Sequence, residues 1–581
     1  MPTQSFEVDP MNVKNPRLLL LLCLLLLIPA YLLTMSAAPT SASTHAGRYL
    51  ATFSPQQPAA LYDWLQFGLN PQHSANNTIE STLNSSNVDQ LQSLFQISLP
   101  DVADGAPVYL HGVSTANGVE NLVFVTTRDA HIVAIDADTG ATVWSKQHSP
   151  VNCKINNGSS TCYTTSSPVI DPNGQFVYSY GFDGQSGKVH KYQVGDGTEI
   201  TTGNWPETAT LKDFDEKESP ALSFATDNTS TTYLYVANGG YPGDNGDYQG
   251  HVTAINLATG SQNVFNAMCS DQAVHFVETP NTPDCAGVQT AIWARPGVIY
   301  DQDTNQIYMA TGNGTFSPGN HEWGDTVFAL HPNGTGSGGN PVQSYTPTNQ
   351  AQLNTDDADL GSTAPAILPA PAGSTVQNLA VQGGKDQKLR LLNLDNLSGQ
   401  GGSGHQGGEI GPLIDVPQGG LVFSQPAVWV NPGDHSTWVF VTTGSGISGL
   451  EVTLNGSNVP QLTTMWKKSN GGTSPVIANN VLYYAGSGNV WALDPTTGSV
   501  LWHDTGIGGI HWESPIVANG VLYIADESGN LTAYALNGAL NTPTITLTPT
   551  ITLTPTITPT PTATPTPMKI FLPFILRRSS P

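Results

Sequence analysis

The chain has 581 residues and carries 44 acidic against 19 basic side chains, so its formal net charge is −25. A chain this acidic repels phosphate, which excludes nonspecific binding to DNA or RNA. Only 11% of the residues are charged, while 59 glycines and 43 prolines interrupt the chain, which excludes coiled coils and favours a large, loop-rich, all-β protein.

The N-terminus has the order of a secretory signal. Lys14 and Arg17 precede an apolar run over 18–33, and small residues follow at 36–38. A run of about 16 residues is shorter than the roughly 20 that span a bilayer. We therefore interpret residues 1–42 as a signal peptide, with an uncleaved N-terminal anchor as the alternative.

Residues 43–90 are dense in aromatic and turn-forming residues, for example at Trp64, Phe67 and Pro71, and we expect them to pack as a cap. The segment 91–99 then reads as a single strand with no hairpin partner beside it in the sequence.

One pattern recurs over 91–541: a proline, a short apolar strand, a turn, and further strands ending near glycine. The spacing averages about 58 residues, which is typical of propeller blades with several strands each. The second strands of the eight predicted units are 122–127, 176–181, 233–239, 306–312, 378–383, 438–444, 481–486 and 521–525.

The count of eight depends on two irregular stretches, 343–362 and 400–411, so seven blades is the alternative. The last unit lacks a fourth strand after 531–536. The orphan strand 91–99 can supply it, and it would thereby close the ring and cover an open sheet edge. The sequence therefore predicts an all-β, eight-bladed propeller closed by an N-terminal strand.

Five cysteines fit export to an oxidising compartment. Cys23 lies in the predicted signal, which leaves Cys153, Cys162, Cys269 and Cys285. These four permit three pairings. We favour the local one, Cys153–Cys162 and Cys269–Cys285, because it closes short loops.

The C-terminus is low in complexity. Residues 542–567 are nearly all threonine and proline, which predicts a disordered, extended stalk without a core. The tail 568–581 is short, apolar and basic, and its apolar part is too short to span a bilayer. This arrangement resembles the stalk and attachment tail of some bacterial surface proteins, and a simple linker with a frayed end is the alternative.

Two copies of one motif identify the repeat. The spacing A-x-D-x-x-T-G-x-x-x-W contains Asp136, Gly140 and Trp144 in one copy, and Asp494, Gly498 and Trp502 in the other. The Asp starts a turn, the Gly permits a positive φ, and the Trp can wedge between blades. The motif resembles the tryptophan-docking repeat of quinoprotein-type propellers, the pyrroloquinoline-quinone-repeat family. That family includes dehydrogenases and cofactor-free scaffolds.

The resemblance implies where a cofactor site would lie. In the dehydrogenases of the family a Trp stacks on the quinone, which implies Trp293 here. An Asn and an acid bind calcium, which implies Asn313 with Asp244 or Asp247, although the expected Glu is absent. An Asp acts as the base, which implies Asp386. The adjacent cysteine pair that covers the quinone in those enzymes is missing from this sequence.

These observations favour an exported, surface-displayed propeller that acts as a non-catalytic binding or scaffold module without a cofactor, or with calcium alone. The alternative is a calcium- and pyrroloquinoline-quinone-dependent dehydrogenase of alcohols or sugars. The expected partner is a surface protein or a glycan rather than nucleic acid. We expect the N-terminal segment or the C-terminal tail to attach the protein to the cell envelope.

Overall fold

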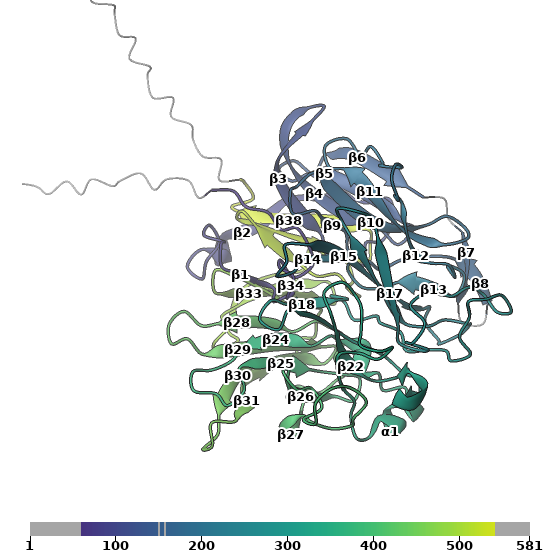
Figure 1. Ribbon diagram of the computed structural model, residues 1–581. Coiled ribbons are helices and arrows are strands. Elements are labelled where there is room, and N and C mark those ends of the chain that lie inside the picture. The colour runs from purple at the N-terminus through teal and green to yellow at the C-terminus, as the bar shows by residue number, and fades with distance from the viewer. Residues whose placement is uncertain (1–59, 149–150, 156–157, 541–581) are drawn as a thin grey trace, which may run out of the picture. The chain divides into compact units, whose positions relative to one another are not determined.

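The computed structural model of the protein describes residues 60–148, 151–155 and 158–540 (Figure 1). The predicted signal peptide, the Thr/Pro stalk and the C-terminal tail lie outside the described residues. Within them, the chain forms eight sheets arranged as the blades of a propeller, with almost no helix.

In each blade the first strand lies nearest the axis. Blade 1 contains β3 (Val108–Thr115), β4 (Gly118–Thr126), β5 (His131–Asp136) and β6 (Thr142–Gln147). Blade 2 contains β9 (Val169–Ile170), β10 (Phe176–Phe182), β11 (Gly187–Gln193) and β12 (Glu207–Thr210). Blade 3 contains β13 (Glu216–Glu218), β14 (Ser223–Thr226), β15 (Thr232–Gly240), β16 (His251–Asn256) and β17 (Gln262–Asn266). Blade 4 contains β18 (Ile299–Asp301), β19 (Gln306–Ala310), β22 (Val327–Leu330) and β23 (Gln343–Tyr345).

The second half of the ring follows the same plan. Blade 5 contains β24 (Ala366–Pro369), β25 (Asn378–Gln382), β26 (Lys388–Asn393) and β27 (Ile410–Asp415). Blade 6 contains β28 (Ala427–Val430), β29 (Thr437–Thr443), β30 (Gly446–Leu454) and β31 (Pro460–Lys468). Blade 7 contains β32 (Val476–Ala478), β33 (Val481–Gly486), β34 (Asn489–Leu493) and β35 (Val500–Asp504), with β1 (Asn76–Asn77) on its inner edge. Blade 8 contains β36 (Ile516–Ala518), β37 (Val521–Ala525), β38 (Asn530–Leu536) and β2 (Leu91–Ser98).

Short elements fill the connections between these strands. They are the hairpins β7 (Asn152–Ile155)–β8 (Gly158–Thr161) and β20 (Phe316–Ser317)–β21 (Glu322–Trp323), the helix α1 (Gln350–Thr355), and the 3₁₀ turns η1 (Val88–Gln90), η2 (Pro318–Asn320) and η3 (Leu360–Ser362). The stretch 343–362 therefore holds the outer strand of blade 4 and two short helical turns. The predicted count of eight is confirmed, and the alternative of seven blades is wrong.

The N-terminal strand closes the ring as predicted. β2 pairs antiparallel with β38, from Leu91 opposite Leu536 to Ser98 opposite Asn530 (Figure 1). The indole N–H of Trp502, in blade 7, donates to the carbonyl of Leu91 at 3.0 Å and ties the closing strand to its neighbour.

The repeated motif joins neighbouring blades. Asp136 accepts the backbone N–H groups of residues 138 and 139, and Asp494 accepts those of 496 and 497, so each Asp starts a turn. The turn ends at a glycine with φ of +76° at Gly140 and +67° at Gly498. A Cβ at Gly498 would lie 2.6 Å from the ring of Trp466 in blade 6, so only glycine lets that indole dock.

The lead-in segment contacts almost the whole ring. Backbone groups of Trp64 bond β3, and the following residues bond the first strands of blades 2, 4, 6 and 7 through Leu65, Pro71, Ser74 and Ala75. Asn77 then bonds the carbonyl of Val517 in blade 8 at 2.9 Å. The segment thus lies across the inner ends of blades that are far apart in sequence.

Both predicted disulfides are present. Cys153–Cys162 joins the hairpin β7–β8, and Cys269–Cys285 closes the loop after β17. Within the described part of the chain, no helix has the length and hydrophobicity needed to cross a membrane.

Candidate functional site

A cavity of about 660 Å³ lies where the blades converge. Its size is within the range of small-molecule sites, which is about 300–1,000 Å³. In each of the eight blades, one residue lies three positions before the repeated proline. Six of these eight residues line the cavity: Thr165, Lys217, Trp293, Phe423, Gly472 and Trp512.

The repeat explains this convergence. A residue that precedes proline is driven into an extended conformation, so each blade enters its first strand along a similar straight path from the axis. In six of the eight blades the residue at this position lines the central space. Sequence reasoning used the prolines to count blades, and reading three positions back from each would have found these six wall residues.

Aromatic rings form one side of the cavity. Trp293 lies there, as the family resemblance implied, with its ring centroid 5.9 Å from that of Phe423 and 6.2 Å from that of Trp512. Phe423 and Trp512 meet edge to face at 5.5 Å. These rings offer flat apolar surface to a planar ligand.

Two carboxylates share a lysine at another side. Lys385 Nζ lies 2.6 Å from Asp359 Oδ2 and 3.0 Å from Asp357 Oδ1. All three residues line the cavity. Burial raises the pKa of Asp359, although Lys385 opposes the shift. Sequence reasoning missed both aspartates because they follow α1, in the stretch that looked irregular.

Asn313 stands directly behind this cluster. Its side-chain N–H donates to Asp357 at 2.7 Å, and its backbone N–H donates to Asp359 Oδ1 at 2.6 Å. Its Oδ1 atom is buried and has no hydrogen-bond partner among the described residues. An amide oxygen without a hydrogen-bond partner, lying beside carboxylates, is a suitable ligand for a hard cation.

The structure separates the two loop aspartates that the sequence grouped as metal ligands. Asp244 lines the cavity and accepts a 2.6 Å hydrogen bond from the hydroxyl of Tyr248. Asp247 is instead held by Lys212, at 3.7 Å, and by the hydroxyl of Thr279, at 2.9 Å. Only Asp244 is placed with the Asp359 cluster at the cavity.

Asp386 is not among the residues that line the cavity. Its carboxylate pairs with the buried guanidinium of Arg390, which lies on β26 four positions further along the chain. The carboxyl group that reaches the cavity beside Trp293 and Lys385 is that of Asp359.

Two buried cationic side chains, Arg295 and Lys217, face the cavity. Among the described residues, neither has a carboxylate within 4 Å. Arg295 donates to the carbonyls of Thr165 and Trp293, both at 3.3 Å, while its Nε atom has no partner. Lys217 Nζ donates to the hydroxyl of Ser219 at 2.6 Å. Burial, reinforced by the nearby Arg295, lowers the pKa of Lys217 to about 7. A buried charge without a counter-ion is costly, which favours an anionic ligand here.

The Cys153–Cys162 disulfide supports the wall near these cations. The hydroxyl of Tyr241 lies 2.8 Å from Cys153 Sγ, and Tyr163 follows Cys162 directly in the chain. Both tyrosines line the cavity, and their rings meet edge to face at 5.7 Å. The disulfide therefore holds part of the cavity wall as well as the hairpin.

Two sequence families match parts of the chain. The family described as "Glucose/ethanol/alcohol dehydrogenase, beta-propeller domain" matches residues 64–331, and the family described as "Outer membrane protein assembly factor BamB" matches residues 438–541. None of the curated proteins compared matches the sequence.

Solved structures share the fold. The quinohemoprotein alcohol dehydrogenase ADHIIG from Pseudomonas putida HK5 is 14% identical, with a TM-score of 0.56 over 83% of this chain and 81% of its own. The quinohemoprotein alcohol dehydrogenase from Comamonas testosteroni is 15% identical, with a TM-score of 0.54 over 84% of this chain and 82% of its own. A europium-containing methanol dehydrogenase is 14% identical, with a TM-score of 0.54 over 82% of this chain and 98% of its own. At these identities the likeness establishes the fold alone.

Proposed function

Because the chain belongs to the PQQ-like β-propeller family, we propose that it is an exported quinone-dependent oxidoreductase that acts on alcohols or sugars. One observation carries the proposal: Trp293, the Asp359–Lys385 pair and two unpaired cations converge on one axial cavity. The sequence alone favoured a non-catalytic module, and this convergence shifts the balance to the alternative.

The cavity residues fit a planar, polycarboxylate quinone and a cation. Lys217 and Arg295 would hold carboxylate groups, the Trp293 ring would pack against the quinone plane, and Asn313 Oδ1 with a neighbouring carboxylate would hold the cation. A bound quinone would supply the two-electron acceptor that the side chains themselves lack.

Asp359 is then the residue placed to move a proton. Lys385 fixes its Oδ2 atom and the backbone N–H of Asn313 fixes Oδ1, so the carboxylate has one orientation. Burial raises its pKa, which makes the ionised form a stronger base toward a substrate hydroxyl.

A second candidate, a non-catalytic binding module, has its own support. Lys385 already forms ion pairs with Asp357 and Asp359, and the adjacent cysteine pair expected of the dehydrogenases is absent from the sequence. In this role the cavity would bind an anionic small molecule without turnover. A surface protein or glycan partner and envelope attachment through either terminus stay predictions.

Binding of pyrroloquinoline quinone with calcium tests the proposal. We expect the purified full-length protein to bind the quinone at micromolar concentration in isothermal titration, and then to reduce a dye with an alcohol or sugar. Trp293→Ala should weaken binding by about 5- to 150-fold, since stacking of a planar group on an aromatic is worth about 1–3 kcal/mol. Trp466→Phe, outside the cavity wall, is the matched control. No binding at 100-fold higher quinone concentration would contradict the proposal.

The affinity for the quinone should also depend on pH through Lys217. Below its pKa of about 7 the ammonium is charged before the anion binds. Above that pH, binding must take up a proton, so affinity should fall by up to about tenfold per pH unit. Lys217→Arg keeps the charge and should flatten the profile. An affinity for wild-type protein that stays constant from about pH 7 to about pH 9 would refute this role of Lys217.

A further inference from the structure

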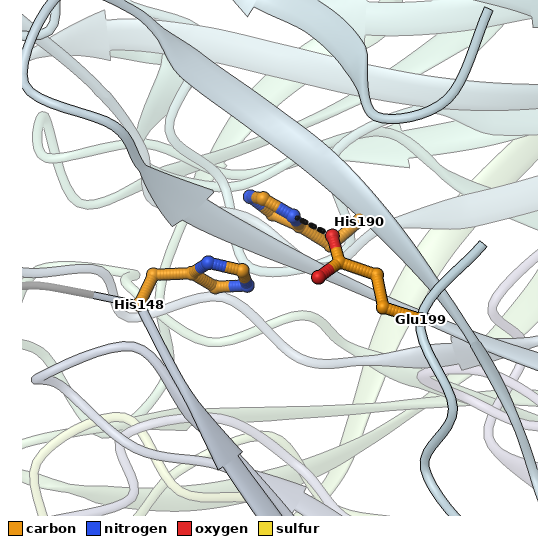
Figure 2. Close-up of side chains that lie close together, drawn as sticks. All are labelled: His148, His190 and Glu199. Atoms are coloured by element: carbon orange, nitrogen blue, oxygen red, sulfur yellow. Dashed lines mark hydrogen bonds and ion pairs between the residues drawn. The ribbon is translucent and has the colours of Figure 1, made fainter. Parts of the chain in front are cut away.

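A second group of ligand-type side chains lies away from the axial cavity, between blades 1 and 2. His148 directly follows β6 of blade 1, His190 lies on β11 of blade 2, and Glu199 follows β11. Figure 2 shows the three side chains directed toward one another. One ligand atom from each residue lies within 4.8 Å of the other two.

The geometry within this group is compact. His190 Nδ1 lies 2.7 Å from Glu199 Oε1, and the two imidazole rings stack with centroids 3.5 Å apart and planes 24° apart (Figure 2). The His190 side chain is 5% exposed and that of Glu199 is 29% exposed. The group is therefore shielded by protein yet reachable from solvent through the carboxylate.

Hydrogen bonds within the protein satisfy this group only in part: His148 Nε2 bonds the hydroxyl of Tyr192, whereas one nitrogen of His190 has no such partner. His190 Nε2 is buried and has no hydrogen-bond partner among the described residues, which is a cost that a purely structural histidine avoids. The stack also requires a glycine, because a Cβ on Gly181 of β10 would lie 2.8 Å from His148 Cδ2. Other histidines, such as His131 with Asp129 at 2.8 Å, form simple pairs with one carboxylate.

The charged side chains around this group favour the binding of a metal cation. Two carboxylates, Asp183 and Glu199, face the imidazoles. Lys146 faces Glu199. Lys188 pairs with Asp183 at 3.3 Å. No ammonium or guanidinium lies within 4 Å of Glu199 among the described residues.

We propose that His148, His190 and Glu199 bind a divalent transition-metal ion of the Zn²⁺ class, with water completing the coordination. Two imidazoles and one carboxylate are a common zinc donor set, whereas Ca²⁺ prefers oxygen ligands. Metal–ligand bonds of about 2.0–2.1 Å place ligand atoms about 3.3 Å apart. Ligand atoms that are now up to 4.8 Å apart would therefore move together by up to about 1.5 Å, and the stacked imidazoles would tilt so that both lone pairs face one ion. The ion would join the end of blade 1 to blade 2, independently of the axial cavity.

A second cluster of similar composition is a weaker candidate for a metal site. Asp104, His511 and Glu527 also lie close together, but Arg128 is 3.3 Å from Asp104 and 3.9 Å from Glu527. The guanidinium therefore already supplies the positive charge that a metal would bring.

Zinc titration of untagged, EDTA-treated full-length protein tests the site. We expect one Zn²⁺ per chain with a micromolar or tighter Kd by isothermal titration, unaffected by millimolar Ca²⁺. Co²⁺ should give visible absorption bands of a nitrogen- and oxygen-ligated ion. His190→Gln and Glu199→Gln should each weaken Zn²⁺ binding at least about 100-fold, more than a change to a group that only orients a ligand.

His131→Gln is the matched control and should leave the Kd unchanged, because it removes a histidine–carboxylate pair without a second imidazole. Circular dichroism and the melting temperature of the metal-free variants establish that they fold. The proposal is overturned if wild-type protein binds no Zn²⁺ at 100 µM. It is also overturned if folded His190→Gln and His148→Gln bind like wild type, or if His511→Gln alone abolishes binding.

Discussion

A variant lacking residues 60–99 is expected to lose the closed ring and to unfold at a much lower temperature than the full chain. The deletion removes β2, so β38 becomes an open edge, and it removes the lead-in residues that bond the inner strands. An unpaired edge also exposes the strand to pairing with other molecules. Differential scanning calorimetry of the two proteins measures the effect.

A milder variant keeps the test interpretable if the truncated chain does not fold. Phe95 and Ile97 of β2 contact Gly140 of blade 1, where a Cβ would lie 2.9 Å from each side chain. Replacing both with alanine should cost about 3 kcal/mol or more of unfolding free energy. Val500→Ala, on the exposed face of β35, is the control and should cost little. Equal denaturation midpoints for all three proteins would show that β2 does not close the ring.

Asp359→Asn is expected to reduce turnover by about 10²–10⁴-fold while leaving quinone affinity nearly unchanged, as for loss of a general base. The substitution keeps the shape of the side chain, and Asp357 still pairs with Lys385. The measurement is kcat for dye reduction by the quinone-loaded protein, with the quinone Kd determined separately.

Asp386→Asn is the informative comparison. This aspartate pairs with Arg390 outside the cavity wall, so its loss should lower stability but not kcat per folded molecule. If Asp386→Asn abolishes turnover and Asp359→Asn does not, the base is Asp386, in the turn before β26, and the cavity assignment fails. If neither variant affects turnover, no carboxylate at either place acts as the base.

The fold could be predicted because each blade repeats local signals. The eight second strands are runs of β-branched and aromatic residues, and all of them occur as strands close to the predicted bounds. The closing strand 91–99 was also predictable, since an incomplete last blade needs an outer strand. The stretch 343–362 was harder because α1 and η3 interrupt the strand pattern.

The site was only partly predictable. The resemblance identified Trp293, Asn313 and Asp244, which lie at or directly behind the cavity. It also indicated Asp386, whose carboxylate pairs with Arg390 four residues along the chain and does not line the cavity. The cations Lys217 and Arg295 are ordinary residues in sequence, and they become unusual only when the ring buries them together.

The ring closure also determines when the last blade can form during synthesis of the chain. Ser98 of β2 and Asn530 of β38 are 432 residues apart, so β2 is synthesised long before its partner exists. At about 5–20 residues per second, β2 waits roughly 20–90 s with a free edge. Half of its eight residues are glutamine or serine, at Gln92, Ser93, Gln96 and Ser98. This polarity should keep the nascent strand from pairing with other chains until the last blade emerges.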